Sequence, residues 1–357
     1  MYVDRVHFYV EDAKKWRNWF IKTMGFDSIA SGSDRHTRVE AVSSGGVILV
    51  ISSPLAESSP VAEYLRFHPP GVSDLAFCVT DIESIMSAAI ATGAKIEQPI
   101  EEKLFPQGQL KWSKITSIAS ISHTLVERKG ITPLLPEEWI EHKQLSPKQS
   151  VNFTGIDHIV LNVPTGDLKN TVSWYEAALG FVRKQDFTIE TERSGLYSQV
   201  MVHPLTGMQF PVNEPISANS QIQEFLDLNK GAGIQHMALS TSQILEVTKK
   251  LRAAGLSFLS VPQTYYTELQ QKYPYLSLSE SEWQQIIDRE ILVDYQQETA
   301  SSIPLLLQTF TQPIFAQPTF FFELIERRFQ ARGFGEGNFR ALFEAIEREQ
   351  IKRSTSK

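Results

Sequence analysis

The stretch Gly155-Ile156-Asp157-His158-Ile159-Val160-Leu161 is a short, mostly apolar run with one histidine set into it. Its β-branched residues favour an extended chain, so the run is predicted to form a buried β-strand. A histidine in such a strand is ordinarily a hydrogen-bonded core residue, and it becomes a candidate metal ligand only when other parts of the chain supply partners. The interpretation of His158 therefore depends on the rest of the sequence.

The composition is that of a globular protein with room for two domains. The chain has 357 residues, of which 42% are hydrophobic and 21% charged, and this length allows each of two domains to bury its own core. Its 34 basic and 41 acidic residues give a net charge of −7. That balance argues against a nucleic acid or an anionic membrane surface as the main partner. A small neutral or anionic ligand in a local pocket is still compatible with it.

Cysteine usage and apolar runs bear on the compartment. The single cysteine, Cys78, excludes an intrachain disulfide and a zinc site built from several thiolates. It lies in an apolar run, which predicts a buried and unreactive thiol. The N-terminal residues do not form a signal peptide, and no apolar run approaches the ~20 residues of a membrane helix. We expect a cytoplasmic protein.

An internal repeat predicts the architecture. The stretch VDRVHFYV (3–10) resembles GIDHIVLNV (155–163), with His7 opposite His158, and GVSDLAF (71–77) matches GIQHMAL (233–239), with Asp74 opposite His236. Each stretch is followed by a helix-like segment that ends at a glycine, a residue suited to helix C-caps. The order of strand, helix and several strands predicts an α+β fold of duplicated βαβββ units, two per domain, forming two open barrel-like domains.

The expected domain boundary lies in a segment that contains proline and lysine. We place an N-terminal domain at residues 1–148 and a C-terminal domain at 149–357, with the linker around 144–149. The interval from His236 to Glu323 spans 87 residues, whereas that from Asp74 to Thr124 spans 50. Most of the surplus is expected within residues 264–302, packed beside the site of the second half, with a capped helix starting at Ser279.

Glu323 lies inside the apolar, strand-like stretch TFFFELIER (319–327). An ionised carboxylate buried without a partner costs several kcal/mol, so Glu323 must be paired, protonated, exposed or bound to a metal. The alternative is an edge strand with Glu323 in water. Strand alternation places Phe321 on the same face as Glu323.

Three candidate ligands, His158, His236 and Glu323, occupy comparable places in successive units. Two imidazoles and one carboxylate without a thiolate are the set that leaves three positions open on Fe(II). Zinc also accepts such ligands, but a closed structural zinc site would need a fourth. In the first half Thr124 falls opposite Glu323 and has no strong ligand group. We therefore interpret the first half as a metal-free structural copy.

These motifs, with the tail GFGEGNFRALF (333–343), resemble the 4-hydroxyphenylpyruvate dioxygenase family within the vicinal oxygen chelate superfamily. The resemblance covers nearly the whole chain and is specific in the second half, with departures in the first half and in 264–302. It implies that His158, His236 and Glu323 bind Fe(II). It also implies catalytic amides and a hydroxyl at Gln235, Gln308, Asn213 and Ser198, and substrate-binding walls at Pro211, Phe310, Phe321, Phe334, Phe339 and Phe343.

The resemblance further implies the reaction. 4-Hydroxyphenylpyruvate and O₂ would give homogentisate and CO₂ by oxidative decarboxylation, ring hydroxylation and side-chain migration, a step of tyrosine catabolism. The tail is expected to form a C-terminal helix with Phe339, Phe343 and Ile346 on one face, which would gate the pocket; the alternative is a helix that only covers the core. The expected partners are these small molecules, with no nucleic acid and no membrane, in a homo-oligomer.

Two other functions stay open. A non-catalytic, ligand-binding member of the superfamily would use the repeats as a scaffold, but a scaffold has no need of all three ligand residues in one half. The other is 4-hydroxymandelate synthase, which uses the same substrate and metal. Phe310 and Phe321 are flat, bulky walls that would press the substrate ring toward the metal, and Pro211 ahead of Asn213 fits the ring-hydroxylating type. We therefore favour homogentisate as the product.

Overall fold

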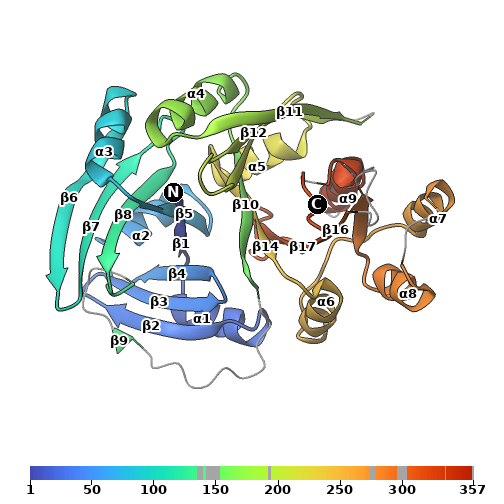
Figure 1. The fold of residues 1–357 in the computed structure, drawn as a ribbon, viewed down its shortest axis with the longest axis horizontal. Helices are drawn as coiled ribbons and strands as arrows, with labels where there is room; N and C mark the ends of the chain where they lie inside the picture. The colour runs from blue at the N-terminus through green and yellow to red at the C-terminus, as the bar shows by residue number, and fades with distance from the viewer. Residues whose placement is uncertain are drawn as a thin grey trace.

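The chain folds into two mixed β-sheets that lie side by side, with helices packed against both faces of the sheets (Figure 1). The structure, a computed structural model, describes residues 1–134, 140–141, 153–191, 194–273, 278–295, 304–333 and 335–355. The expected linker at 144–149 lies outside these ranges. The first sheet has nine strands in the order β6-β7-β8-β5-β1-β4-β3-β2-β9, and the second has eight in the order β11-β12-β13-β10-β14-β17-β16-β15.

The N-terminal half contains two βαβββ units in succession. The first consists of β1 (Tyr2–Tyr9), α1 (Ala13–Lys22), β2 (Asp27–Ser33), β3 (Thr37–Ser44) and β4 (Val47–Pro54), followed by α2 (Pro60–Phe67). The second consists of β5 (Gly71–Val79), α3 (Ile82–Ala91), β6 (Lys95–Phe105), β7 (Gly108–Thr116) and β8 (Ser122–Gly130). The short β9 (Ile140–Glu141) pairs with β2.

The C-terminal half repeats this order with additions. Its first unit is β10 (Gly155–Asn162), α4 (Leu168–Leu179), β11 (Val182–Glu190), β12 (Gly195–Val202) and β13 (Gln209–Pro215), followed by α5 (Gln221–Asn229). Its second is β14 (Gly233–Ser240), α6 (Ile244–Ala253), α7 (Gln263–Lys272), α8 (Glu280–Asp288), β15 (Leu292–Tyr295), β16 (Leu305–Phe310) and β17 (Phe321–Arg328), before α9 (Glu336–Thr355). The predicted α+β fold of duplicated βαβββ units is confirmed.

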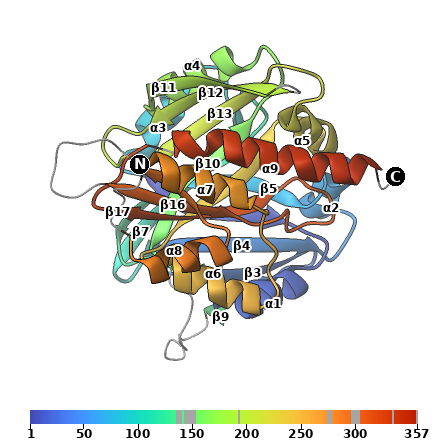
Figure 2. The ribbon, with the colours of Figure 1, turned by 90° about the vertical axis from the view of Figure 1, so that its right-hand side faces the viewer.

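The added residues form two helices between α6 and β15. In the first half α3 leads almost directly into β6, whereas α7 and α8 fill the same interval in the second half. The predicted start of α8 is correct, since the Ser279 side chain accepts a hydrogen bond of 3.2 Å from the Glu282 backbone N–H. Helix α9 crosses the C-terminal sheet, with α7 beside it (Figure 2). None of the described helices is both long and apolar enough to span a membrane.

Strand alternation separates a shared core from two barrel interiors. Val6 and Phe8 of β1 and Ile159 and Leu161 of β10 point into a single apolar cluster that draws on both halves. There the rings of Phe8 and Phe320 meet edge to face with centroids 5.1 Å apart. The intervening residues of these strands therefore face the barrel interiors, where a site can form.

Strand register corrects one predicted equivalence. His7 pairs with Asp74 in the first sheet, but the residue that pairs with His236 in the second is Val160. His158 pairs with Ala238, which lies two residues after His236. In the first sheet Arg5 pairs with Ala76, which lies two residues after Asp74. The prediction that His7 lies opposite His158 is therefore wrong. His7 sits two residues farther along the same strand face, a shift that the two-residue period of a strand conceals in the sequence.

The other two equivalences are confirmed by the register. Asp74 pairs with Ser122 in the first sheet, as His236 pairs with Phe321 in the second. Two residues farther along these closing strands, Thr124 falls at the position of Glu323. The first-half residues at the three candidate ligand positions are thus Arg5, Asp74 and Thr124.

Candidate metal centre

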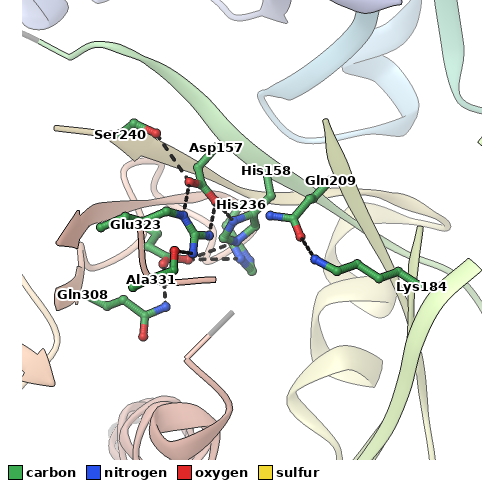
Figure 3. Close-up of polar contacts among 10 residues, drawn as sticks. Asp157, His158, Lys184, Gln209, His236, Ser240, Gln308, Glu323 and Ala331 are labelled. Carbon is green, nitrogen blue, oxygen red and sulfur yellow. Dashed lines mark hydrogen bonds and ion pairs between the residues drawn. The ribbon is translucent and has the colours of Figure 1, made fainter. Parts of the chain in front are cut away.

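Three adjacent strands of the second sheet bring the candidate ligands together. His158 lies on β10, His236 on β14 and Glu323 on β17. Glu323 Oε2 is 3.2 Å from His158 Nε2 and 3.8 Å from His236 Nε2, and the side chains converge on one point (Figure 3). All three residues are buried, and theirs is the one such cluster found in the described part of the chain.

Two β-bulges help to aim these side chains. In the pairing of β10 with β14, Val160 faces His236 and Leu161 faces Ile234, so Gln235 is an extra residue. Both Gln235 and His236 consequently line the same cavity. A bulge re-aims side chains in this way at the cost of one unpaired residue. The second bulge leaves Asp157 unpaired beside His158.

The electrostatics of the cluster favour a cation. Burial alone would lower the pKa of His158, but the negative charges of Glu323 and Asp157 outweigh it and raise that pKa to about 9. Burial and the neighbouring His158 hold the pKa of His236 well below its usual value. The buried carboxylate thus requires one positive charge beside it, and a divalent metal bound by two neutral imidazoles meets that requirement.

Further side chains orient the ligands. Gln308 Nε2 donates to Glu323 Oε1 at 2.9 Å, and Asn338 Nδ2 of α9 donates to Gln308 Oε1 at 2.9 Å. The Tyr265 hydroxyl of α7 donates to Asn338 Oδ1 at 2.8 Å. The Phe321 ring stacks on the His236 ring with centroids 4.7 Å apart. The cluster is therefore connected to both α9 and the inserted helix α7.

A cavity with apolar walls opens onto the three ligands. It contains ≈ 680 Å³ of free space, counting the part open to solvent. The predicted site residues that line it are Ser198, Pro211, Asn213, Gln235, Gln308, Phe310, Phe321 and Phe343, together with the three ligands. Phe334 and the side chain of Phe339 lie outside the described part of the chain. Tyr265 and Tyr266 are not among the lining residues.

Several lining residues were not singled out from the sequence, among them Gln221, Gly335 and Asn338. Gln221 follows Ser220, the N-cap of α5, and its side chain is buried. In the sequence, its only signal was an amide side chain in the first turn of a helix. Gly335 has φ +76°, and a Cβ there would lie 1.9 Å from Gln308 Oε1. The residue must therefore be glycine for the loop to approach Gln308.

Two polar atoms of the cavity wall have no protein partner among the described residues. They are Ser198 Oγ and Gln221 Oε1, and both are buried. Buried polar atoms are nearly always hydrogen-bonded in folded proteins, so unpaired ones facing a cavity indicate a ligand that pairs with them. The cavity thus presents a cluster of candidate metal ligands at one end and polar anchors on an otherwise largely apolar wall.

The fold and this site define a protein of the vicinal oxygen chelate class. Residues 155–273 match the family model described as "Glyoxalase/Bleomycin resistance protein/Dioxygenase superfamily". The chain is 37% identical to 4-hydroxyphenylpyruvate dioxygenase of Caenorhabditis briggsae, over 98% of this chain and 92% of that protein. It is 36% identical to the enzyme of that name from Dictyostelium discoideum, over 98% of each. The chain belongs to the 4-hydroxyphenylpyruvate dioxygenase family.

A solved structure gives the same relationship in three dimensions. A triple mutant of 4-hydroxymandelate synthase from Streptomyces coelicolor superposes with a TM-score of 0.85 over 98% of each chain. The two sequences are 27% identical. This likeness extends through both halves of the chain and supports the duplicated architecture.

Proposed function

We propose that this protein is an Fe(II)-dependent dioxygenase that converts 4-hydroxyphenylpyruvate and O₂ to homogentisate and CO₂. The observation that carries the proposal is the buried cluster of His158, His236 and Glu323 at the end of a cavity with apolar walls. Two histidines and one carboxylate with open positions are the ligand set of non-haem Fe(II) oxygenases. Family membership supplies the substrate class.

The charges of the cavity support an anionic, metal-chelating substrate. The only charged side chain among the lining residues described, apart from the histidines, is Glu323. A 2-oxo acid would therefore meet no lysine or arginine there, and its carboxylate requires the metal as counter-charge. Bound Fe(II) would supply the coordination positions for the keto acid and O₂ and the redox chemistry between them.

The remaining lining residues would bind and orient the aromatic ring. Phe310, Phe321 and Phe343 form flat apolar walls, while Ser198 and Gln221 offer unpaired polar atoms. Such a combination fixes the position of a ring that carries one polar group. Helix α9 would close the cavity and exclude water, which protects a reactive oxidant from side reactions.

The second candidate is 4-hydroxymandelate synthase, and the structural likeness to that enzyme favours it. The two reactions differ in the substrate carbon that is hydroxylated, so they depend on which carbon the walls hold nearest the metal. Phe310 and Phe321 both line the cavity, and the Phe321 ring lies against the ligand His236. Walls of this bulk support a ring held close to the metal, and hence ring hydroxylation.

Anaerobic reconstitution with Fe(II), followed by O₂ uptake with 4-hydroxyphenylpyruvate and chromatography of the products, tests the proposal. We expect one homogentisate and one CO₂ for each O₂ consumed. 4-Hydroxymandelate as the main product would select the second candidate. Absence of O₂ uptake by metal-loaded protein would favour a non-catalytic, ligand-binding role. A place in tyrosine catabolism, a cytoplasmic location and a homo-oligomeric state remain predictions.

A further inference from the structure

The candidate ligand His158 has a carboxylate on the side away from the cluster. Its Nε2 faces Glu323, and its Nδ1 lies 3.0 Å from Asp157 Oδ1. A carboxylate at Nδ1 favours the tautomer with the proton on that nitrogen, which leaves the Nε2 lone pair for a metal. Asp157 is the extra residue of a β-bulge, so its side chain can lie beside that of the next residue.

Arg327 holds this carboxylate with two hydrogen bonds. Its Nε donates to Asp157 Oδ2 and its Nη2 to Asp157 Oδ1, each at 2.7 Å. Bidentate pairing of this kind fixes the plane of a carboxylate as well as its position. The third nitrogen, Nη1, donates to the Ala331 carbonyl at 3.3 Å, so this contact also holds the guanidinium in place. Asp157 therefore has little freedom to rotate away from His158.

The first half contains the same ion pair without a metal ligand. Arg128 Nε donates to Asp4 Oδ1 at 2.9 Å and Arg128 Nη2 to Asp4 Oδ2 at 3.0 Å. Arg128 also donates to a carbonyl beyond its strand, that of Pro133, at 2.7 Å. The residue beside Asp4 is Arg5, which occupies the position of His158. The pair thus belongs to the repeated scaffold, and only in the second half does it contact a candidate ligand.

We propose that Asp157 and Arg327 are positioning residues that hold the His158 ring in the orientation and tautomer required for metal binding. The inference rests on the proposed metal site, because His158 must be a ligand for the pair to act. Outer carboxylates that bind a ligating histidine change metal affinity by roughly 10–100-fold in other proteins. The repeat supplies a matched control for the structural part of the effect.

The test compares equivalent variants in the two halves. Asp157→Asn is compared with Asp4→Asn, and Arg327→Gln is compared with Arg128→Gln. Co(II) alone serves as the probe. Its affinity is measured by competition with a chelating dye, and its d–d absorption reports the ligand geometry. We expect the second-half variants to bind Co(II) roughly 10–100-fold more weakly with an altered spectrum. The first-half variants should stay within about twofold of the unmodified protein.

Three outcomes contradict the inference or its basis. Unchanged Co(II) affinity in folded Asp157→Asn and Arg327→Gln would overturn the positioning role. An equal loss in Asp4→Asn and Asp157→Asn would assign the pair to stability alone. Failure of the unmodified protein to bind Co(II) would overturn the proposed metal site itself.

A milder substitution covers the case in which those variants do not fold. Arg327→Lys keeps the positive charge but cannot make the bidentate contact with Asp157. Arg128→Lys is its control. We expect Arg327→Lys to weaken Co(II) binding by roughly 3–10-fold and Arg128→Lys to leave it unchanged. Equal affinities in these two variants would count against the inference.

Discussion

The two halves of this protein share a scaffold that includes equivalent β-bulges, yet among the described residues only the second half brings candidate metal ligands together. Both halves have β-bulges at equivalent places, at Asp4 and Ser73 in the first and at Asp157 and Gln235 in the second. A glutamate also caps a helix in each half: Glu127 accepts from the Ile82 backbone N–H at 2.9 Å, as Glu326 does from Ile244 at 2.7 Å. Backbone geometry alone therefore does not make the site.

The difference lies in the side chains at the ligand positions. In the first half Arg5 donates to Asp4, and Asp74 accepts from Ser122 Oγ at 3.0 Å. His7 is paired with Ser52 Oγ at 2.7 Å, and burial lowers its pKa to about 3. Polar groups in this interior therefore satisfy one another. In the second half two imidazoles and a carboxylate converge, and α9 covers the cavity beside them.

The largest expected effect comes from removing a ligand. His158→Ala, His236→Ala or Glu323→Ala should abolish tight Fe(II) binding and lower turnover by about 10³-fold or more, because in the proposed site each would supply one of three ligand atoms. Thr124→Val and His7→Ala should leave both largely intact. Metal analysis and O₂ uptake give the measurement. Two tightly bound metals per chain would break the comparison between the halves.

A smaller effect is expected from removing helix α9, which has no counterpart among the described residues of the first half. Deletion of residues 333–357 takes away Asn338, the hydrogen-bond partner of Gln308, and Phe343 of the cavity wall. Product formed per O₂ consumed should fall by roughly 100-fold while Fe(II) binding persists, since water then reaches the oxidant. A chain lacking only 356–357 is the control. Normal coupling in the shorter chain would make α9 a cover and not a gate.

A third prediction concerns the wall residue Phe321, whose first-half counterpart is Ser122. Phe321→Ile should let the substrate ring retreat and bring the benzylic carbon closer to the oxidant. We expect the share of 4-hydroxymandelate to rise on the order of tenfold, because a displacement of about 1 Å can redirect a reaction. Chromatography of the products measures it, with Phe310→Ile as a second wall variant. Fe(II) affinity is measured in parallel, because Phe321 also stacks on His236. Homogentisate alone from both variants would contradict the steric argument.

The smallest effect concerns His123, which lies in the first half and contacts the second. Its Nε2 is 2.8 Å from the Tyr175 hydroxyl, and burial lowers its pKa to about 4. The unfolded chain takes up this proton near pH 6.5 and the folded chain only near pH 4, so stability falls as the pH drops between them. Between pH 6.5 and pH 5.5 the free energy of unfolding should fall by about 1 kcal/mol from this cause.

His123→Gln removes this titration and keeps a hydrogen-bonding side chain. The free energy of unfolding is measured with urea at pH 6.5 and pH 5.5. Its decrease between the two should be about 1 kcal/mol smaller in His123→Gln than in the unmodified protein. His36→Gln, which replaces an exposed histidine of the same half, is the matched control. An unchanged pH dependence in His123→Gln would show that His123 is not held neutral in the folded state.

Local patterns in the sequence were enough for the repeat and for the residue types of the site. Alternation and repeated order predicted the βαβββ units, and the imidazole and carboxylate positions 158, 236 and 323 stood out within apolar strands. Burial and strand alternation are properties of neighbouring residues, so they leave a trace in the chain itself. The start of α8 at Ser279 was predictable for the same reason.

Tertiary structure alone decided the register and the distant contacts. Only strand pairing showed that Arg5, and not His7, stands at the position of His158. Only packing brought Arg327 to Asp157 and Asn338 of α9 to Gln308. These contacts join residues 30 to 170 positions apart, so no local pattern in the sequence records them. A two-residue shift of a strand preserves its pattern of buried and exposed faces but changes every residue with which it pairs. The sequence by itself determined which residue types can form the site, and the pairing of strands determined which of them meet.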